Sequence, residues 1–148
     1  MKVAVLMGSK SDAERMKAAR DMLNRFGVEV DERVLSAHRN PDEVAAFARG
    51  ARENGYAALI CGAGMAAHLA GVVAAHTTLP VVGVPLSGSA LSGVDALYST
   101  VQMPSGIPVA TVAIDGASNA AVLVVEMLAM TDAGLAARLE EFRAGGAR

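Results

Sequence analysis

Polar residues capable of chemistry stand in short clusters directly after the apolar runs of this 148-residue chain. Four such clusters follow four runs, at residues 8–12, 36–42, 62–68 and 87–93. In a parallel sheet the carboxyl ends of the strands share one edge, and ligands bind along that edge. The spacing therefore predicts that the four clusters meet and form a single ligand site.

The first cluster, Gly-Ser-Lys-Ser-Asp at residues 8–12, suits an anion. Backbone N–H groups and hydroxyls at the start of a helix bind phosphate, although a tight turn capped by Ser11 would use the same residues. A Walker A loop is excluded because Ser9 stands where that motif requires glycine before the lysine, and the dinucleotide glycine fingerprint is missing too. A phosphomonoester is the ligand that we expect here.

The second and third clusters add two histidines and an arginine. Arg39 can bind phosphate oxygens with both arms of its guanidinium, while His38 is either a proton donor or an ordinary loop residue. His68 is expected in the first turns of a helix, where the helix dipole favours an uncharged imidazole that can act as a base. A capped or solvated histidine is the alternative, and the glycines of residues 62–64 either let the backbone approach a ligand or only make a turn.

The other candidates are interpreted as structural. His76 lies eight residues beyond His68 and so away from the predicted edge. Asp95 and Asp115 are interpreted as capping or turn residues, and Cys61 as a buried strand residue. No grouping of His, Cys or carboxylate residues has the spacing of metal ligands, so no metal is expected.

Apolar periodicity predicts the elements that must position these clusters. Strands are expected at 3–7, 28–35, 57–61, 81–84 and 109–114, and helices at 12–26, from Asn40–Pro41 to Gly55, and at 66–75, 94–102 and 117–130. The pairs Ser11/Glu14 and Asn40/Glu43 have the spacing of capping boxes. Strands alternating with helices predict an α/β fold, a flavodoxin-like three-layer sandwich around a five-stranded parallel sheet.

The end of the chain does not fit a single sandwich. The helix at 117–130 is apolar almost all round, and a final helix carries an apolar stripe at Leu135, Leu139 and Phe142. We expect this C-terminal helix to pack on other subunits. The chain is therefore predicted to be one domain, residues 1–148, with an α/β core at 1–130 and a C-terminal helix and tail at 131–148.

The amino-acid composition limits the kinds of partner that the chain is expected to bind. Hydrophobic residues make up 53% of the chain and aromatic residues 3%, an apolar fraction that favours contact between subunits. A formal net charge of −2 does not favour a nucleic-acid partner. One cysteine rules out an intrachain disulfide and suits a reducing compartment. No run approaches the roughly 18 apolar residues of a membrane span, so a cytoplasmic protein without membrane contact is expected.

Taken together, the clusters resemble one known family, the N5-carboxyaminoimidazole ribonucleotide mutases (PurE), over nearly the whole chain. The matching stretches are residues 8–12, 36–39 with Pro41, 62–64 with 66–69, 90–95, 101–109 and 118–121. The chain departs from the family's usual residues at four positions, where Cys61, Met65, Ala70 and Val72 replace alanine, glycine, proline and methionine. A side chain at position 65 is expected to crowd the base or the carboxylate of the ligand.

This resemblance implies a homo-octamer that acts on a ribonucleotide with one phosphate, using no metal, biotin, ATP or other cofactor. It implies that Ser9, Ser11 and Arg39 bind the phosphate and that Asp12 binds the ribose. The remaining substrate-binding residues would be Ser36, Gly62, Ala63, Gly64 and Leu69. Each site would also take residues from an adjacent subunit.

His38 and His68 would be the catalytic histidines, with His68 the better candidate for the proton shuttle. The implied reaction moves a carboxyl group from N5 to C4 of aminoimidazole ribonucleotide by loss and recapture of CO2.

Two alternatives stay open. One is the related aminoimidazole ribonucleotide carboxylase, which uses dissolved CO2. The other is a non-catalytic mononucleotide- or flavin-binding module of flavodoxin type, although the chain has no Trp and only two Tyr to stack on a flavin.

Overall fold

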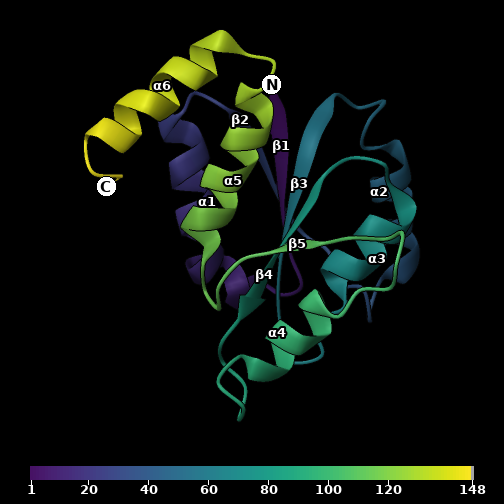
Figure 1. Ribbon diagram of the computed structural model, residues 1–148. Coiled ribbons are helices and arrows are strands. Elements are labelled where there is room, and N and C mark those ends of the chain that lie inside the picture. The colour runs from purple at the N-terminus through teal and green to yellow at the C-terminus, as the bar shows by residue number, and fades with distance from the viewer. Residues whose placement is uncertain (148) are drawn as a thin grey trace.

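A computed structural model describes residues 1–147 and shows a five-stranded sheet in which every neighbouring pair is parallel (Figure 1). The strands are β1 (Lys2–Met7), β2 (Glu29–Val34), β3 (Tyr56–Gly64), β4 (Val81–Leu86) and β5 (Ala110–Thr111). Their order is β2-β1-β3-β4-β5, the flavodoxin-like order. The predicted α/β class and sheet are confirmed.

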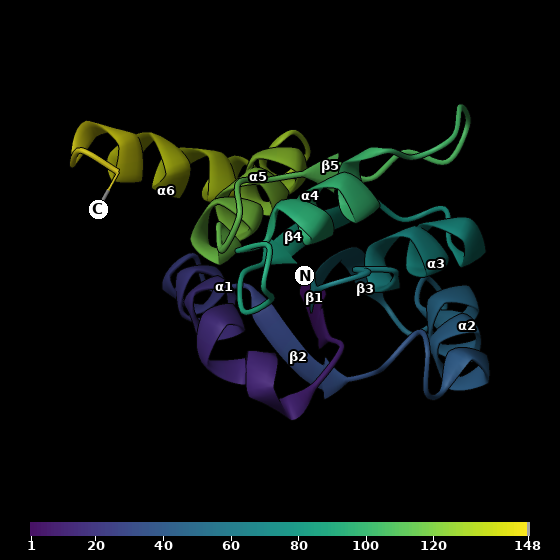
Figure 2. The ribbon, with the colours of Figure 1, turned by 90° about the horizontal axis from the view of Figure 1, so that it is seen from below.

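Helices cover both faces of the sheet (Figure 1). One face carries α1 (Ala13–Arg25) and α5 (Ala117–Ala129), with α6 (Ala133–Ala144) packed on α5. The other face carries α2 (Pro41–Gly50), α3 (Leu69–His76) and α4 (Val94–Val101). Figure 2 looks onto the edge where the strands end, with α4 beside β4 and β5.

The side chains of β1 point alternately to the two faces of the sheet, and the core is therefore divided into two clusters. Val3 and Val5 pack with buried residues of α1 and α5, whereas Ala4 and Leu6 pack with residues of α2 and α3. Successive side chains of a strand point to opposite faces, and here both faces are covered. This explains why β1 is an unbroken apolar run in the sequence.

Two strands at the sheet edges differ in length or burial from the central ones. β2 is exposed or half-buried along its length, as its polar residues predicted. β5 is only two residues long instead of the expected 109–114. The Pro85 carbonyl of β4 accepts from the Asp115 backbone N–H at 2.8 Å, so the N–H that proline lacks falls on the β5 side. The ladder between β4 and β5 is interrupted there.

The start of the first helix also differs from the prediction. Residues Lys10–Asp12 form a 3₁₀ turn, η1, before α1 begins at Ala13. Ser9 caps this turn by accepting from the Ser11 backbone N–H, and Asp12, at the N-cap of α1, makes no side-chain cap bond. The Ser11/Glu14 capping box is therefore wrong, and the hydroxyl that caps belongs to Ser9.

The apolar stripe of α6 is largely covered within its own chain. Leu135 and Phe142 are buried, and Phe142 meets the Phe26 ring edge to face at 5.3 Å between centroids. Arg25 lies over the Phe142 ring. These contacts give α6 a place against the sandwich that the sequence pattern did not provide. A contact between α6 and a second subunit stays a prediction.

Cys61 lies in β3 and is 1% exposed, among the core residues that face α2 and α3. Burial raises the pKa of its thiol far above the usual range. Its interpretation as a buried strand residue is confirmed. Within residues 1–147, no helix combines the length and apolarity that a membrane span requires.

Candidate active site

Two backbone hydrogen bonds bring three of the polar clusters together at the edge where β2, β1 and β3 end. The Leu35 N–H donates to the Met7 carbonyl at 2.9 Å, and the Gly8 N–H donates to the Gly62 carbonyl at 3.2 Å. The sheet places β2 and β3 on either side of β1. The loops that follow these strands therefore start side by side.

A pair of histidines in contact forms the centre of this edge. His38 Nε2 lies 3.2 Å from His68 Nδ1, and the ring centroids are 5.2 Å apart with the planes inclined by 46°. Both side chains are exposed in the single chain. A hydrogen bond between two ring nitrogens requires one donor and one lone pair, so the facing nitrogens share one proton. The outer nitrogen of each ring is left for other partners.

The turn that carries His38 is built by its polar neighbours. The Asn40 side chain accepts from the Ser36 N–H at 2.8 Å and donates to Glu43 at 2.7 Å, while the Ser36 hydroxyl accepts from the Arg39 N–H at 3.3 Å. Asn40 is the N-cap residue of α2, as predicted, but its side chain makes no cap hydrogen bond to the helix. Instead, Asn40 fixes the turn that presents His38.

Arg39 follows His38 in this turn, and its side chain is exposed. Within residues 1–147 its guanidinium makes no hydrogen bond or ion pair. Its five N–H donors are therefore available to an anionic ligand.

The first cluster places two hydroxyls and a carboxylate at the same edge, beside the end of β3. Ser9 Oγ accepts from the Ser11 backbone N–H at 3.3 Å and from the Ser11 hydroxyl at 2.9 Å. A Cβ on Gly8 would lie 3.8 Å from Asp12 Oδ2 and 3.9 Å from Ala63 Cβ, so Asp12 and Ala63 flank Gly8. The cluster thus reaches the end of β3.

Burial raises the pKa of the Asp12 carboxyl above its ordinary value of 3.8, and this outweighs a hydrogen bond from the Ser9 backbone and the charge of Arg15, which both lower it. A half-buried carboxylate of this kind accepts hydrogen bonds readily, because it has lost part of its hydration.

The glycines of residues 62–64 serve packing at least as much as a ligand. A Cβ on Gly62 would lie only 2.2 Å from Met16 Sδ, so glycine is needed where α1 crosses the end of β3. A Cβ on Gly64 would lie 3.3 Å from the Leu86 carbonyl oxygen. Leu69 is 2% exposed and belongs to the core, so only its backbone can face a ligand.

Met65 is the unusual residue of this loop. Its φ is +55°, in the left-handed region, and its side chain is 66% exposed. Left-handed backbone costs a residue with a side chain roughly 1–2 kcal/mol. A glycine would adopt this conformation freely. The loop therefore holds Met65 in an unfavourable backbone conformation, with its side chain toward solvent.

The fourth cluster is held by residues that the sequence analysis did not join to it. The Ser87 backbone N–H donates to Asp115 Oδ1 at 2.9 Å, and the Ser87 hydroxyl donates to Asp115 Oδ2 at 2.5 Å. Arg15 Nε lies 3.8 Å from Asp115 Oδ1. The sequence predicts a capping or turn role for Asp115, and its φ of +57° fits a turn. Its contact with Ser87 spans 28 positions, which no local pattern could reveal.

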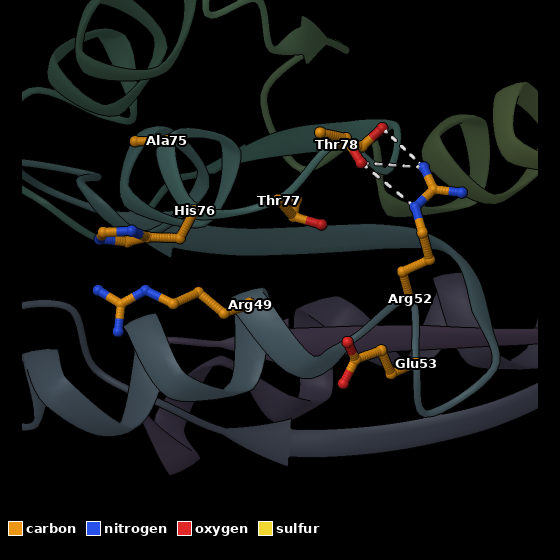
Figure 3. Close-up of a pocket in the computed structure, with 7 residues that line it drawn as sticks. All are labelled: Arg49, Arg52, Glu53, Ala75, His76, Thr77 and Thr78. Carbon is orange, nitrogen blue, oxygen red and sulfur yellow. Dashed lines mark hydrogen bonds between the residues drawn. The ribbon is translucent and has the colours of Figure 1, made fainter.

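A hollow of about 470 Å³ lies away from the histidine pair, between the ends of α2 and α3. Figure 3 shows Arg49 extended beneath the His76 ring and Arg52 hydrogen-bonded to Thr78. His76 lies eight residues beyond His68 along α3, which places it about 12 Å from His68 along the helix axis. Within residues 1–147, no group of three or more His, Cys, Asp and Glu side chains could hold a metal ion.

Comparison with known proteins gives consistent matches over nearly the whole chain. Residues 2–148 match the family model described as AIR carboxylase. The chain is 55% identical over 143 residues to the N5-carboxyaminoimidazole ribonucleotide mutase of Brucella melitensis biotype 1, covering 95% of this chain and 88% of that protein. It is 52% identical over 144 residues to the Escherichia coli K12 protein of the same name, covering 96% and 85%.

A solved structure is similar in fold as well. The crystal structure of Treponema denticola PurE superposes with a TM-score of 0.90 at 28% sequence identity, covering 99% of this chain and 91% of that one.

Proposed function

The chain belongs to the AIR carboxylase family, and from this premise we propose that it is an N5-carboxyaminoimidazole ribonucleotide mutase of purine biosynthesis. The curated relatives that support this carry that name at 50–55% identity over 95% or more of the chain. The observation that carries the proposal is the contact of His38 and His68 at 3.2 Å, beside an anion-binding loop. A module that only binds a nucleotide has no use for such a pair.

The substrate is held, in this proposal, by the groups that border the histidine pair. The hydroxyls of Ser9 and Ser11 and the unpaired guanidinium of Arg39 bind the phosphate, because all three offer donors at one edge of the sheet. Asp12 accepts hydrogen bonds from the ribose hydroxyls. Gly8 and Ala63, which lie against each other, form the floor between phosphate and base.

The further binding residues of the proposal are Ser36, Gly62, Gly64 and Leu69. Leu69 contributes through its backbone, since its side chain is in the core. The Ser36 hydroxyl already accepts from the Arg39 N–H, and its own hydrogen remains free to donate.

The chemistry uses one proton and returns it. His68 gives a proton to N5 of the substrate while the bond from N5 to the carboxyl carbon breaks, so that the electron pair stays on nitrogen and CO2 is released. C4 of the electron-rich ring then attacks CO2, forming the new carbon–carbon bond. His68 takes the proton from C4, and the ring becomes aromatic again.

The second imidazole supports this cycle. With its Nδ1 bonded to His38, His68 keeps a fixed ring orientation, and the shared proton can move as His68 gains or loses one at Nε2. Keeping CO2 beside C4 makes the recapture effectively unimolecular, which lowers its barrier by several kcal/mol.

The experiment offers two carboxyl donors to the purified protein. We expect rapid formation of 4-carboxy-5-aminoimidazole ribonucleotide from the N5-carbamate, and little from aminoimidazole ribonucleotide with bicarbonate and dissolved CO2. Faster use of dissolved CO2 would identify the chain as a carboxylase, the activity that the family description names. No turnover with either donor, together with tight nucleotide binding, would identify a binding module.

We also propose that the protein assembles as a cytoplasmic homo-oligomer, with eight subunits as the resemblance implies. Val94, Tyr98 and Val101 are exposed and follow one another at helical spacing on α4, and Leu91 is exposed just before the helix. A second copy of the chain is the partner that we propose for this stripe. The buried thiol of Cys61 suits the reducing cytoplasm.

A further inference from the structure

Asp115 stands out because its backbone and its carboxylate are both committed to one loop. Its φ of +57° is unfavourable for a residue with a side chain, though Asp tolerates it better than most. In this conformation its N–H donates to the Pro85 carbonyl at 2.8 Å, and its two carboxylate oxygens accept from the N–H and hydroxyl of Ser87. Asp115 is thus hydrogen-bonded to the residues on both sides of Leu86, where β4 ends.

Arg15 completes this arrangement from α1. Its Nε lies 3.8 Å from Asp115 Oδ1, and a Cβ on Gly88 would lie 3.3 Å from its Nη2, so the guanidinium lies against Gly88. Gly88, at φ +118°, has no side chain that would push it away. Arg15 also lies one helical turn beyond Asp12, on the same face of α1. It therefore stands between the first cluster and the fourth.

The other end of the loop is fastened separately. The Ser89 hydroxyl donates to Asp95 at 2.9 Å and accepts from the Leu91 N–H at 3.2 Å. Loop 87–93 is thus tied to α4 at one end and to Asp115 and Arg15 at the other. The preceding residue, Leu86, pairs with Gly64 of the candidate site.

We propose that Asp115 and Arg15 are positioning residues that hold loop 87–93 beside the substrate, as a clasp between the phosphate-binding end of α1 and the end of β4. The clasp comprises Asp115, Arg15, Ser87 and Gly88. It rests on the proposed function, because the loop is useful only where a substrate binds. Neither residue touches reacting atoms; each acts by keeping the loop ordered before the ligand arrives.

The test replaces Asp115 with glycine, since glycine keeps the left-handed turn and removes only the carboxylate. For Asp115→Gly we expect the Ser87 amide and its loop neighbours to exchange hydrogen at least tenfold faster. We expect kcat/KM to fall about tenfold, mostly through KM, because the loop must then be ordered on binding. Asp115→Asn, which keeps one oxygen acceptor and tolerates positive φ, should recover most of both losses.

Glu126→Gln is the matched control. It removes the ion pair that Glu126 of α5 makes with Arg143 of α6. The exposed fraction of the Glu126 side chain, 37%, is close to the 40% of Asp115. Loop exchange and kinetics should stay at wild-type values. If Asp115→Gly lowers expression of folded protein, Ser87→Ala removes the hydroxyl bond alone and should move both readouts in the same direction by a smaller factor.

A turn-only role for Asp115 predicts that the glycine variant keeps wild-type loop exchange and wild-type kinetics, and that result overturns the clasp. Faster loop exchange with unchanged KM and kcat would show that the clasp exists and would overturn its role in positioning the loop for the substrate. The exchange measurement does not need turnover, so an inactive wild-type protein would refute the proposed function while the loop result still decides whether the clasp exists.

Discussion

At the level of single residues, the contact between His38 and His68 couples the positions of the two imidazoles. The facing nitrogens are 3.2 Å apart and share a proton. Removing either ring therefore changes the orientation of the other. His68 is the N-cap residue of α3, so the helix fixes the position of its backbone.

The first prediction concerns His68→Asn. We expect kcat to fall by a factor of about 10²–10⁴, the usual contribution of a general acid–base group, with binding of the ribonucleotide changed little. Steady-state kinetics and calorimetric titration with the product measure the two effects. His76→Asn is the control, because the same change at the far end of α3 should leave both quantities unaltered. Retention of a near-normal rate in His68→Asn would remove this residue from the mechanism.

The second prediction concerns the cost of holding Asp12 partly out of water. Because its pKa is raised in the folded protein, the folded state binds the proton more tightly than the unfolded state does. The ionised carboxylate then lowers stability as pH rises from 3.8 through the raised pKa, and the loss is constant above it. Asp12→Asn should unfold at higher urea concentration than wild type at pH 7, with no difference at pH 3.

The same substitution should weaken binding of the ribonucleotide, since Asn offers one acceptor where the carboxylate offers two. Asp42→Asn is the matched control. Asp42 is an exposed acid in the first turn of α2, where a negative charge is favourable. That variant should gain no stability at pH 7. Equal behaviour of the two variants would contradict the role of burial at Asp12.

At the level of elements, the crossing of α1 over the end of β3 fixes the site's geometry. Gly62 has no side chain because Met16 Sδ occupies the place where its Cβ would be. The loop that carries His68 is thus anchored to α1, the helix that follows the first polar cluster.

The third prediction follows from this contact. Gly62→Ala places a methyl group 2.2 Å from Met16 Sδ and should lower the free energy of unfolding by about 1–3 kcal/mol, the usual range for an overpacked core. Chemical denaturation measures the change. Gly50→Ala, whose Cβ meets only the flexible Asn54 side chain at 3.1 Å in α2, should be neutral or stabilising by up to about 1 kcal/mol. A loss in Gly50→Ala as large as that in Gly62→Ala would contradict the packing explanation.

The sequence predicted these elements well where the pattern was local. The apolar run of β1, the glycine after α1 and the proline at the start of α2 each carry their own signal. The prediction that Ser11 caps the first turn was wrong because Ser9 and Ser11 carry the same hydroxyl and are equally good cap residues on chemical grounds. The extent of β5 was wrong because it depends on Pro85 of its neighbour, not on the residues of 109–114 themselves.

The same limit applies to the site. The clusters with His38 and His68 could be predicted from their position after apolar runs, because parallel strands end on one edge. The grip of Asp115 on Ser87 could not, since it joins positions 28 apart through a turn at positive φ. The packing reason for Gly62 likewise required knowing that α1 crosses β3.

At the scale of the whole molecule, exposed apolar side chains gather on and just before α4 and not on α6. Tyr98 is 62% exposed and Leu91 63%, whereas Leu135 and Phe142 of α6 are buried in their own chain. The apolar surplus noted in the sequence is therefore available to a neighbour chiefly beside β4 and β5.

The fourth prediction tests this surface. Tyr98→Glu places a charge in the middle of the α4 stripe. It should convert the proposed oligomer into smaller species, measured by sedimentation velocity or light scattering, because burying an unpaired charge between subunits is unfavourable. Met130→Glu is the control, since Met130 is 85% exposed but lies outside the stripe, between α5 and α6. Its assembly should match wild type. An unchanged mass for Tyr98→Glu would show that the subunits meet elsewhere.

The burial of Cys61 has a practical consequence for watching this protein move. A thiol-reactive dye can attach only while the centre of the sheet has come apart, and the chain has one thiol to label. The labelling rate in dilute reagent would therefore report how often β3, the strand that leads into the His68 loop, separates from its neighbours. Adding the ribonucleotide should lower this labelling rate if the ligand holds the strand ends together.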